Sequence, residues 1–241
     1  MLANASQTLF AHVVNRPDDQ LELDVAALLI GDWEQRELDV ASYLQMLDRL
    51  AAAAAENMED DEPLSAITSL NRVLFQEHGF RGNQDDYYDP QNSFLSSVLD
   101  RKTGIPITLS VVYIEVARRL GLPVKGVGFP GHFLVRYDLD DSAMLVIDPF
   151  RMGMMLDQEA LQAILESITG KSTPLTPSLL AAASNRDILI RMLNNLAAIY
   201  RRKGDTQGSI EVLQRLLILD PSLHQIEAEL TRLRHRPSEV N

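Results

Sequence analysis

Two side chains in this sequence, His132 and Asp148, are of the types and at the spacing that could do chemistry. An imidazole that is oriented by a carboxylate can act as a general base or can bind an anion in its protonated form. The remaining histidines have no partner at the spacing that metal sites require, so we expect no metal and no cofactor.

The elements around His132 are expected to place it at the start of a helix. Pro106 suits the first position of a helix that runs to Leu120. About 14 residues of helix span roughly 21 Å, and a strand over Val124–Phe129 returns about 20 Å. We therefore expect His132 beside the first helical turn, where free N–H groups and the helix dipole favour an anion or a developing oxyanion.

Asp148 is expected to reach the same place through a hairpin. The strands HFLVRY and MLVID are separated by DLDDSA, a loop with hairpin turn chemistry. Pairing Tyr137 with Met144 puts His132 opposite position 149, within one residue of Asp148, and cross-strand neighbours are about 5 Å apart. The alternative is a buried histidine that is satisfied by a neighbour and has no function.

Hydroxyl groups near Pro106 are candidate nucleophiles. Thr108 lies in the first helical turn, Ser110 lies about one turn along and faces the core, and Thr103 precedes the helix. We expect the apolar residues of this helix to be buried. Its charged residues are expected to face outward: Glu115, Arg118 and Arg119.

The stretch RGNQDDYYDPQNS is rich in turn formers and too long for a simple connector, and loops of this kind often carry function. The residues that it and the next helix could bring to a binding pocket are Arg81, Asn83, Tyr87, Tyr88, Asn92 and Arg101. Alternatively, the tyrosines pack under the loop and the Asx side chains only form turns.

Hydrophobic periodicity predicts helices over 24–30, from about residue 39 onward, and over 64–74. Ser93 can cap a further helix that ends at Gly104. Residues 1–20 show only a short apolar patch. The fold class is therefore α+β and mostly helical, with a small antiparallel sheet.

Composition excludes several functions. The chain has 241 residues, a net charge of −12 and no cysteine. The absence of cysteine rules out disulfides, thiolate metal sites and thiol nucleophiles. The acidic balance argues against binding to nucleic acid or to anionic membranes. No leader-like or membrane-spanning apolar segment is recognised, so we expect a cytoplasmic protein.

The segments GIPITLS and RRLGLP resemble the transglutaminase-like core of the papain-type fold, and the resemblance places Gly104, Gly121 and Pro123 on family counterparts. It also places the family's catalytic histidine and aspartate on His132 and Asp148. The cysteine position falls on Pro106, so transglutaminase and thiol protease chemistry are excluded.

More of the chain resembles a SirB-type family of bacterial proteins. The matching segments are LNRVLFQEHGFRGN, YYDPQNSFLSSVLDRKTGIPITLS, GVGFPGHFLVR and IDPF. That family combines a transglutaminase-like domain with tetratricopeptide-like repeats. The resemblance implies a transglutaminase-like domain over 1–168, in which 1–100 are helical and 101–150 form a central helix and sheet. It also implies a tetratricopeptide-like helical region over 178–236.

Residues beyond the linker ITGKSTPLTPS also follow tetratricopeptide spacing: Leu193, Leu196, Ala197, Tyr200, Ser209, Leu213 and Pro221. So short an array is expected to pack on the first domain.

Two functions follow. The first is a non-catalytic binding or adaptor protein, a pseudoenzyme with a protein or peptide partner. The second is an amide or ester hydrolase in which His132 and Asp148 activate water or a hydroxyl group.

Overall fold

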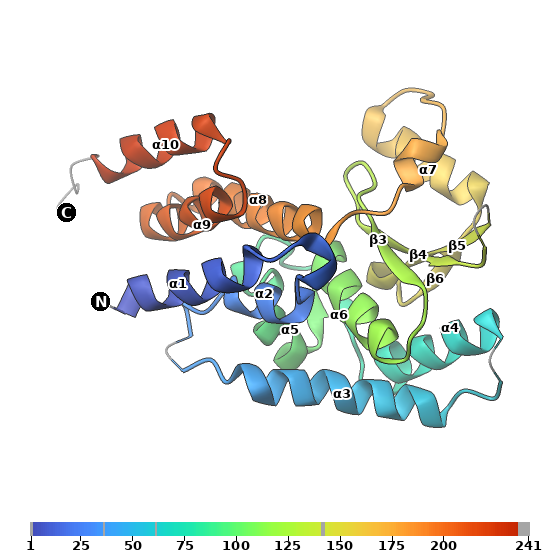
Figure 1. The fold of residues 1–241 in the computed structure, drawn as a ribbon. Coiled ribbons are helices and arrows are strands. Elements are labelled where there is room, and N and C mark those ends of the chain that lie inside the picture. Colours follow the sequence, from blue (N-terminus) through green and yellow to red (C-terminus); the bar gives the residue numbers. More distant parts are fainter. Residues whose placement is uncertain (1, 36, 61, 141–142, 236–241) are drawn as a thin grey trace.

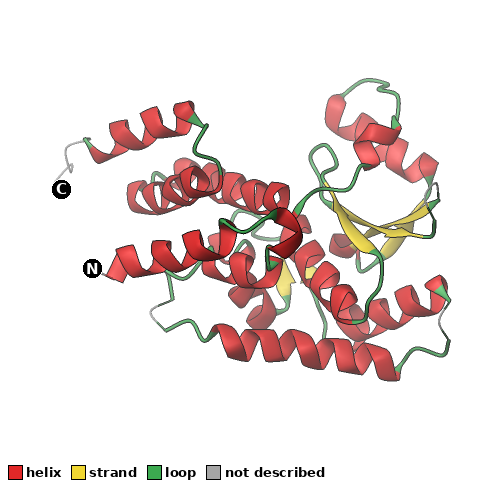
Figure 2. Ribbon diagram, in the orientation of Figure 1, coloured by secondary structure: helices red, strands yellow, loops and turns green. Residues whose placement is uncertain are grey.

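The computed structural model describes residues 2–35, 37–60, 62–140 and 143–235 of the chain. As expected, the described residues are mostly helical with a small antiparallel sheet (Figures 1 and 2). The helices are α1 (Leu2–Val14), α2 (Leu23–Leu29), α3 (Val40–Glu56), α4 (Pro63–Asn71), α5 (Leu95–Arg101), α6 (Pro106–Arg119), α7 (Gln158–Thr169), α8 (Asn185–Lys203), α9 (Thr206–Leu219) and α10 (His224–Arg234).

The main sheet has four antiparallel strands in the order of the chain. They are β3 (Val124–Val127), β4 (Leu134–Asp138), β5 (Met144–Asp148) and β6 (Met154–Leu156). Two short strands, β1 (Arg81–Gly82) and β2 (Thr103–Gly104), pair in parallel just before α6. Among the described residues, no helix combines the length and the apolar character needed to cross a bilayer.

The central helix α6 begins at Pro106, as the sequence predicts, and every residue from Pro106 to Ala117 is buried. It packs against α3, α5 and the strands β3 and β4. Its apolar residues and one face of the sheet, including Val135 and Ile147, belong to the main core. The other face, including Leu134 and Val146, packs under α7 in a second apolar cluster (Figure 1).

The register of the hairpin differs from the prediction by one residue. Tyr137 pairs with Leu145, and Asp138 pairs with Met144. Successive strand residues face opposite sides of a sheet, so the predicted pairing would have put His132 and Asp148 on opposite faces. The observed register does not by itself pair His132 with Asp148, because β4 begins only at Leu134 and His132 lies before it.

Three expectations for the helices were wrong. Helix α1 was not predicted. Its residues Phe10, Val13 and Val14 pack into the main core, and this tertiary packing stabilises the helix. Phe94, not Ser93, is the N-cap of α5. That helix ends at Arg101 and not at Gly104, and its C-cap is Lys102, which adopts a left-handed conformation.

Glu115 on α6 was expected to face solvent, but it is buried. It accepts hydrogen bonds from Arg118 (2.8 Å) and Arg119 (2.9 Å), and both arginines also contact the buried Asp24. Arg118 remains about half exposed, whereas Arg119 is largely covered. Helix α2 supplies Asp24, so only the tertiary structure closes this network.

The C-terminal helices pack on the rest of the molecule (Figure 1). Helices α8 and α9 form a pair whose turn uses Gly204 at a φ of +69°, and α9 also contacts α1. Their apolar residues join the main core. The domain limits at 168 and 178 and the tetratricopeptide identity stay predictions, and residue 236 lies outside the described residues.

Candidate functional site

The structure brings His132 and Asp148 together. The distance from His132 Nε2 to Asp148 Oδ2 is 2.8 Å. The Asp148 side chain is fully buried, whereas 13% of the His132 side chain is exposed. A carboxylate only accepts hydrogen bonds, so Nε2 carries the proton. The other ring nitrogen, Nδ1, is then free to accept a proton or a hydrogen bond from a ligand.

Asp148 is held by the backbone that follows it. Its Oδ1 atom accepts from the backbone N–H groups of Phe150 (3.0 Å) and Arg151 (3.3 Å), and the Arg151 Nε atom lies 3.7 Å from Oδ2. Strand β5 ends at this residue, and the local turn therefore fixes the carboxylate. The carboxylate in turn fixes the imidazole.

His132 was expected to begin a strand. It lies instead in the turn before β4. Its backbone N–H donates to the carbonyl of Phe129, and Gly131 adopts a φ of +60° that favours glycine. The turn places the ring beside the start of α6. His132 and Pro106 both line a small pocket of about 120 Å³.

Two residues of α8 complete this pocket, and neither was predicted. Arg191 Nη2 donates to the backbone carbonyls of Phe129 (3.0 Å) and His132 (2.6 Å). Its guanidinium carbon lies 5.4 Å from the centre of the Phe133 ring. Asn195 lies one helical turn further along. Arg191 thus fixes the backbone of the turn that carries His132.

The signal for Arg191 is absent from the local sequence, because it lies 59 residues beyond His132 on another helix. Burial lowers the pKa of its guanidinium, and a partial opposite effect comes from nearby Tyr87. Among the described residues, Arg191 makes no ion pair with a carboxylate.

The hydroxyl of Thr108, which was expected to be a possible nucleophile, is engaged elsewhere. It accepts from the backbone N–H of Ile105 (3.1 Å) and donates to the backbone carbonyl of Asn92 (2.7 Å). Thr108 is fully buried and does not line the His132 pocket. Ser110 is also fully buried, and the Thr103 hydroxyl donates to the carbonyl of Arg101.

The loop before α5 divides into a structural segment and a segment that reaches the pocket. Asn92 is fully buried and its amide donates to the carbonyl of Asp86 (2.7 Å). Asn83 donates to Asn92 Oδ1 (3.1 Å) and also forms a turn with Asp86. Of the predicted binding residues, only Tyr87 lines the His132 pocket. The Asx residues thus follow the turn-forming alternative.

Tyr88, Arg81 and Arg101 lie outside the pocket. The rings of Tyr87 and Tyr88 are in edge contact, with centroids 5.4 Å apart, and both are partly exposed. Arg81, Asn83 and Arg101 line a separate polar hollow of about 530 Å³, and Arg101 pairs with Asp89 (2.8 Å). The predicted binding set is therefore not one site.

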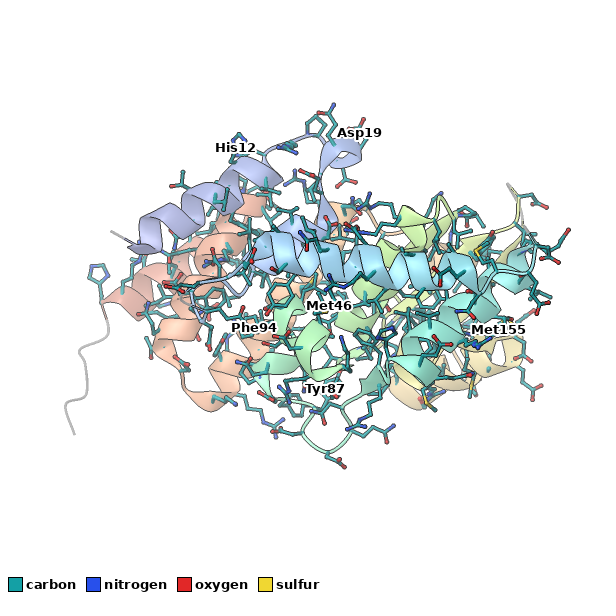
Figure 3. All side chains as sticks on the ribbon, turned by 90° about the horizontal axis from the view of Figure 1, so that it is seen from below. His12, Asp19, Met46, Tyr87, Phe94 and Met155 are labelled. Carbon is teal, nitrogen blue, oxygen red and sulfur yellow. The ribbon has the colours of Figure 1, made fainter. Side chains whose placement is uncertain are left out.

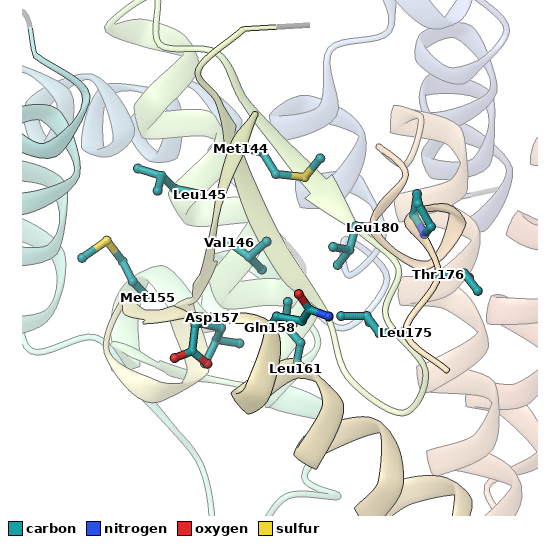
Figure 4. A pocket seen from close by; sticks show the side chains of 12 residues that line it. Met144, Leu145, Val146, Met155, Asp157, Gln158, Leu161, Leu175, Thr176 and Leu180 are labelled. Carbon is teal, nitrogen blue, oxygen red and sulfur yellow. The ribbon is translucent and has the colours of Figure 1, made fainter. Parts of the chain in front are cut away.

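A larger apolar pocket lies elsewhere, between β5, β6, α7 and the segment that follows α7. Its volume is about 740 Å³, and Met144, Val146 and Leu161 are among its lining residues (Figure 4). Figure 3 shows Met155 of this pocket well apart from Tyr87 of the His132 pocket. No His132 pocket residue contributes to it.

No group of three or more His, Asp or Glu side chains in the described residues is arranged to hold a metal ion. The expected absence of a metal and a cofactor stays a prediction. What the site offers chemically is an oriented imidazole, a guanidinium and an amide around a small pocket.

Residues 41–194 match the family model of the Transglutaminase-like superfamily, and the chain belongs to that superfamily. It is similar to bacterial UPF0162 proteins. One from Xylella fastidiosa strain 9a5c is 40% identical over 210 residues, which are 85% of this chain and 74% of that protein. Another, from Pseudomonas aeruginosa, is 30% identical over 86% of this chain and 76% of its own length.

A eukaryotic protein is also similar. F-box only protein 21 of Mus musculus is 32% identical over 186 residues, which are 74% of this chain but only 28% of that protein. The region shared with this chain is thus one section of a longer protein there. No solved structure matches the chain.

Proposed function

We propose that this protein is a non-catalytic binding or adaptor protein built on a transglutaminase-like fold, with a protein or peptide as its partner. The observation that carries the proposal is the residue opposite the imidazole. Pro106 lines the pocket with His132, and proline has neither a nucleophilic side chain nor a backbone N–H. The nearest candidate hydroxyl along α6, that of Thr108, already makes hydrogen bonds to backbone atoms.

Two further observations support the proposal. The region shared with F-box only protein 21 occupies a minor share of that chain, as expected for a module that serves a larger protein. In this chain, α8 contributes Arg191 and Asn195 to the pocket, so the predicted tetratricopeptide-like helices extend the surface available to a partner. A cytoplasmic location belongs to the same proposal.

A second candidate function is favoured by one observation, the 2.8 Å contact between His132 and Asp148. An imidazole oriented in this way could activate a water molecule for hydrolysis of an ester or an amide. Under this alternative the pocket would hold the scissile carbonyl group.

The two functions are separated by assaying the purified protein against p-nitrophenyl esters and against a glutamine-containing peptide. We expect no turnover that depends on His132. Peptide binding, measured by NMR titration, should weaken in His132→Ala. Turnover that disappears in His132→Ala would overturn the binding proposal in favour of hydrolysis.

Pro106→Cys tests the geometry of the site, because the introduced thiol would be the only one in the chain. Next to His132, this thiol should react rapidly with iodoacetamide at pH values below about 8.5, the ordinary pKa of a cysteine. The enhancement should vanish in the double variant with His132→Ala. Equal reactivity of the single and double variants would show that the histidine does not face position 106.

A further inference from the structure

The His132 pocket contains a cation and several hydrogen-bond donors but no carboxylate. Arg191 uses Nη2 for two backbone carbonyls, and Nε and Nη1 donate to no atom of the described residues. Its lining residues are Tyr87, Pro106, Ile107, Gly131, His132, Phe133, Arg191 and Asn195. Asp148 lies behind the imidazole, where His132 and two backbone N–H groups occupy it.

The other polar groups of the pocket are donors or can become donors. Asn195 lies four residues after Arg191, on the same face of α8. Ile107 is the second residue of α6, and its backbone N–H has no acceptor within the helix. The phenol of Tyr87 and a protonated imidazole can also donate. A ligand with acceptor atoms matches these donors, and a negative charge on it would balance Arg191.

The size of the pocket limits the ligand. A volume of about 120 Å³ corresponds to roughly four water molecules at about 30 Å³ each. A carboxylate with one or two carbons attached fits such a space. The planar guanidinium of Arg191 also matches the geometry of a carboxylate.

The surroundings of the pocket favour a peptide as the bearer of the carboxylate. Tyr87 continues from the pocket to Tyr88, and these two rings are 38% and 50% exposed. The guanidinium carbon of Arg202 lies 4.3 Å from the centre of the Tyr88 ring, which adds a second cation next to this aromatic surface. Exposed aromatic rings beside arginines are typical of residues that bind protein partners.

We propose that the His132 pocket recognises a carboxylate of a peptide partner, with Arg191 and Asn195 as its binding residues and Tyr87 and Tyr88 as the surface for an adjacent apolar side chain. This inference rests on the proposed binding function and names its ligand. The carboxylate belongs either to an Asp or Glu side chain or to the C-terminus of the partner.

The test uses pairs of peptides that differ only in charge. One pair is an acetylated and amidated tetrapeptide with Phe-Glu at its centre and its Phe-Gln counterpart. The other pair is an acetylated tripeptide ending in Phe, as the free acid and as the amide. Affinities for the full-length protein are measured by NMR titration. At least one acid should bind about tenfold or more tightly than its amide, as a hydrogen-bonded charge pair predicts.

The decisive variant is Asn195→Asp, which keeps the size of the side chain and supplies Arg191 with a carboxylate from within its own helix. It should remove the preference for the acid, so that the acid and the amide of a pair bind with equal affinity. The matched control is Asn194→Asp, because Asn194 is exposed, does not line the pocket and receives the same charge. This control should change the preference by no more than about twofold, since exposed charges are screened.

Arg191→Gln provides a second variant and should also remove the preference for the acid. Three outcomes would overturn the carboxylate proposal: no binding of either acid at millimolar concentration, equal affinities for acid and amide, or equal losses in Asn195→Asp and Asn194→Asp. Binding of both members of a pair with equal affinity would leave the binding function standing. Hydrolysis of a peptide that depends on His132 would instead contradict the binding function. In that case the ratio of the affinities for acid and amide would still test whether the pocket recognises a carboxylate.

Discussion

Two arginines of the C-terminal helices, Arg191 on α8 and Arg215 on α9, reach into the rest of the molecule and meet different surroundings. Arg215 is fully buried and pairs with Asp32 (2.6 Å) and Glu211 (2.9 Å). Its guanidinium also lies 4.3 Å from the Trp33 ring. Arg191 also stacks on an aromatic ring, but its hydrogen bonds go to backbone carbonyls and its charge has no carboxylate partner among the described residues.

This difference indicates a structural role for Arg215 and a ligand-binding role for Arg191. A buried charge that is matched within the chain holds elements together, and removing one partner leaves the other uncompensated. A guanidinium beside a pocket that lacks carboxylates retains donors for a ligand. The two ends of α6 repeat the contrast, since the network around Glu115 is closed by Arg118 and Arg119, whereas the pocket at Pro106 is open.

The largest effect is expected for Arg215→Met, which removes the guanidinium that pairs with Asp32 and Glu211. We expect a loss of about 3–5 kcal/mol in the free energy of unfolding. Arg191→Met should lose only about 1–2 kcal/mol, because it removes hydrogen bonds to backbone carbonyls. Urea unfolding at pH 7 measures both, and losses of equal size would remove the distinction between the two arginines.

The closed network around Glu115 predicts a dependence of stability on pH. Burial and the charge of Asp24 raise the pKa of Glu115 from 4.5 to about 7, against the effect of Arg118 and Arg119. The folded state thus holds this proton more tightly than the unfolded state does. The contribution of the group is fully present below pH 4.5 and is lost as the pH rises through 7, by about 3 kcal/mol in total.

Glu115→Gln should flatten the stability profile between pH 4.5 and pH 7, as measured by urea unfolding at several pH values. Asp24 acts in the opposite direction at lower pH. Burial alone would raise its pKa, but hydrogen bonds from Arg119 and from the backbone N–H of Val25 lower it overall. Its stabilising contribution is present above about pH 4 and is lost as the pH falls. If the free energy of unfolding of Glu115→Gln varied with pH between 4.5 and 7 as it does in the unmodified protein, Glu115 would not be the source of this pH dependence.

A small effect is also expected for Thr108, whose buried hydroxyl makes hydrogen bonds to backbone atoms. Thr108→Val leaves the Ile105 N–H and the Asn92 carbonyl without this hydroxyl and should destabilise the protein by about 1–2 kcal/mol. Thr108→Ser keeps the hydroxyl and serves as the control. Peptide affinity should be the same in both variants. A loss of function in Thr108→Val without a loss of stability would indicate that the hydroxyl acts chemically.

Local sequence signals were sufficient where short-range geometry decides the structure. Pro106 marks the first residue of α6, and the limits of β5 at Met144 and Asp148 coincide with the predicted strand. The contact between His132 and Asp148 could be anticipated because two adjacent strands bring both residues to the same place. The hairpin register was predicted one residue off, since the loop between the strands permits more than one pairing.

The sequence by itself determined that the chain has no thiol, that proline begins the central helix and that a histidine and an aspartate meet beside it. These properties depend on composition and on short segments of chain. Only the tertiary structure decided that Arg191 and Asn195 complete the pocket, that the Thr108 hydroxyl faces the Asn92 carbonyl, and that Glu115 is buried. Each of these depends on packing between elements distant in sequence, and hydrophobic periodicity does not specify which elements pack together.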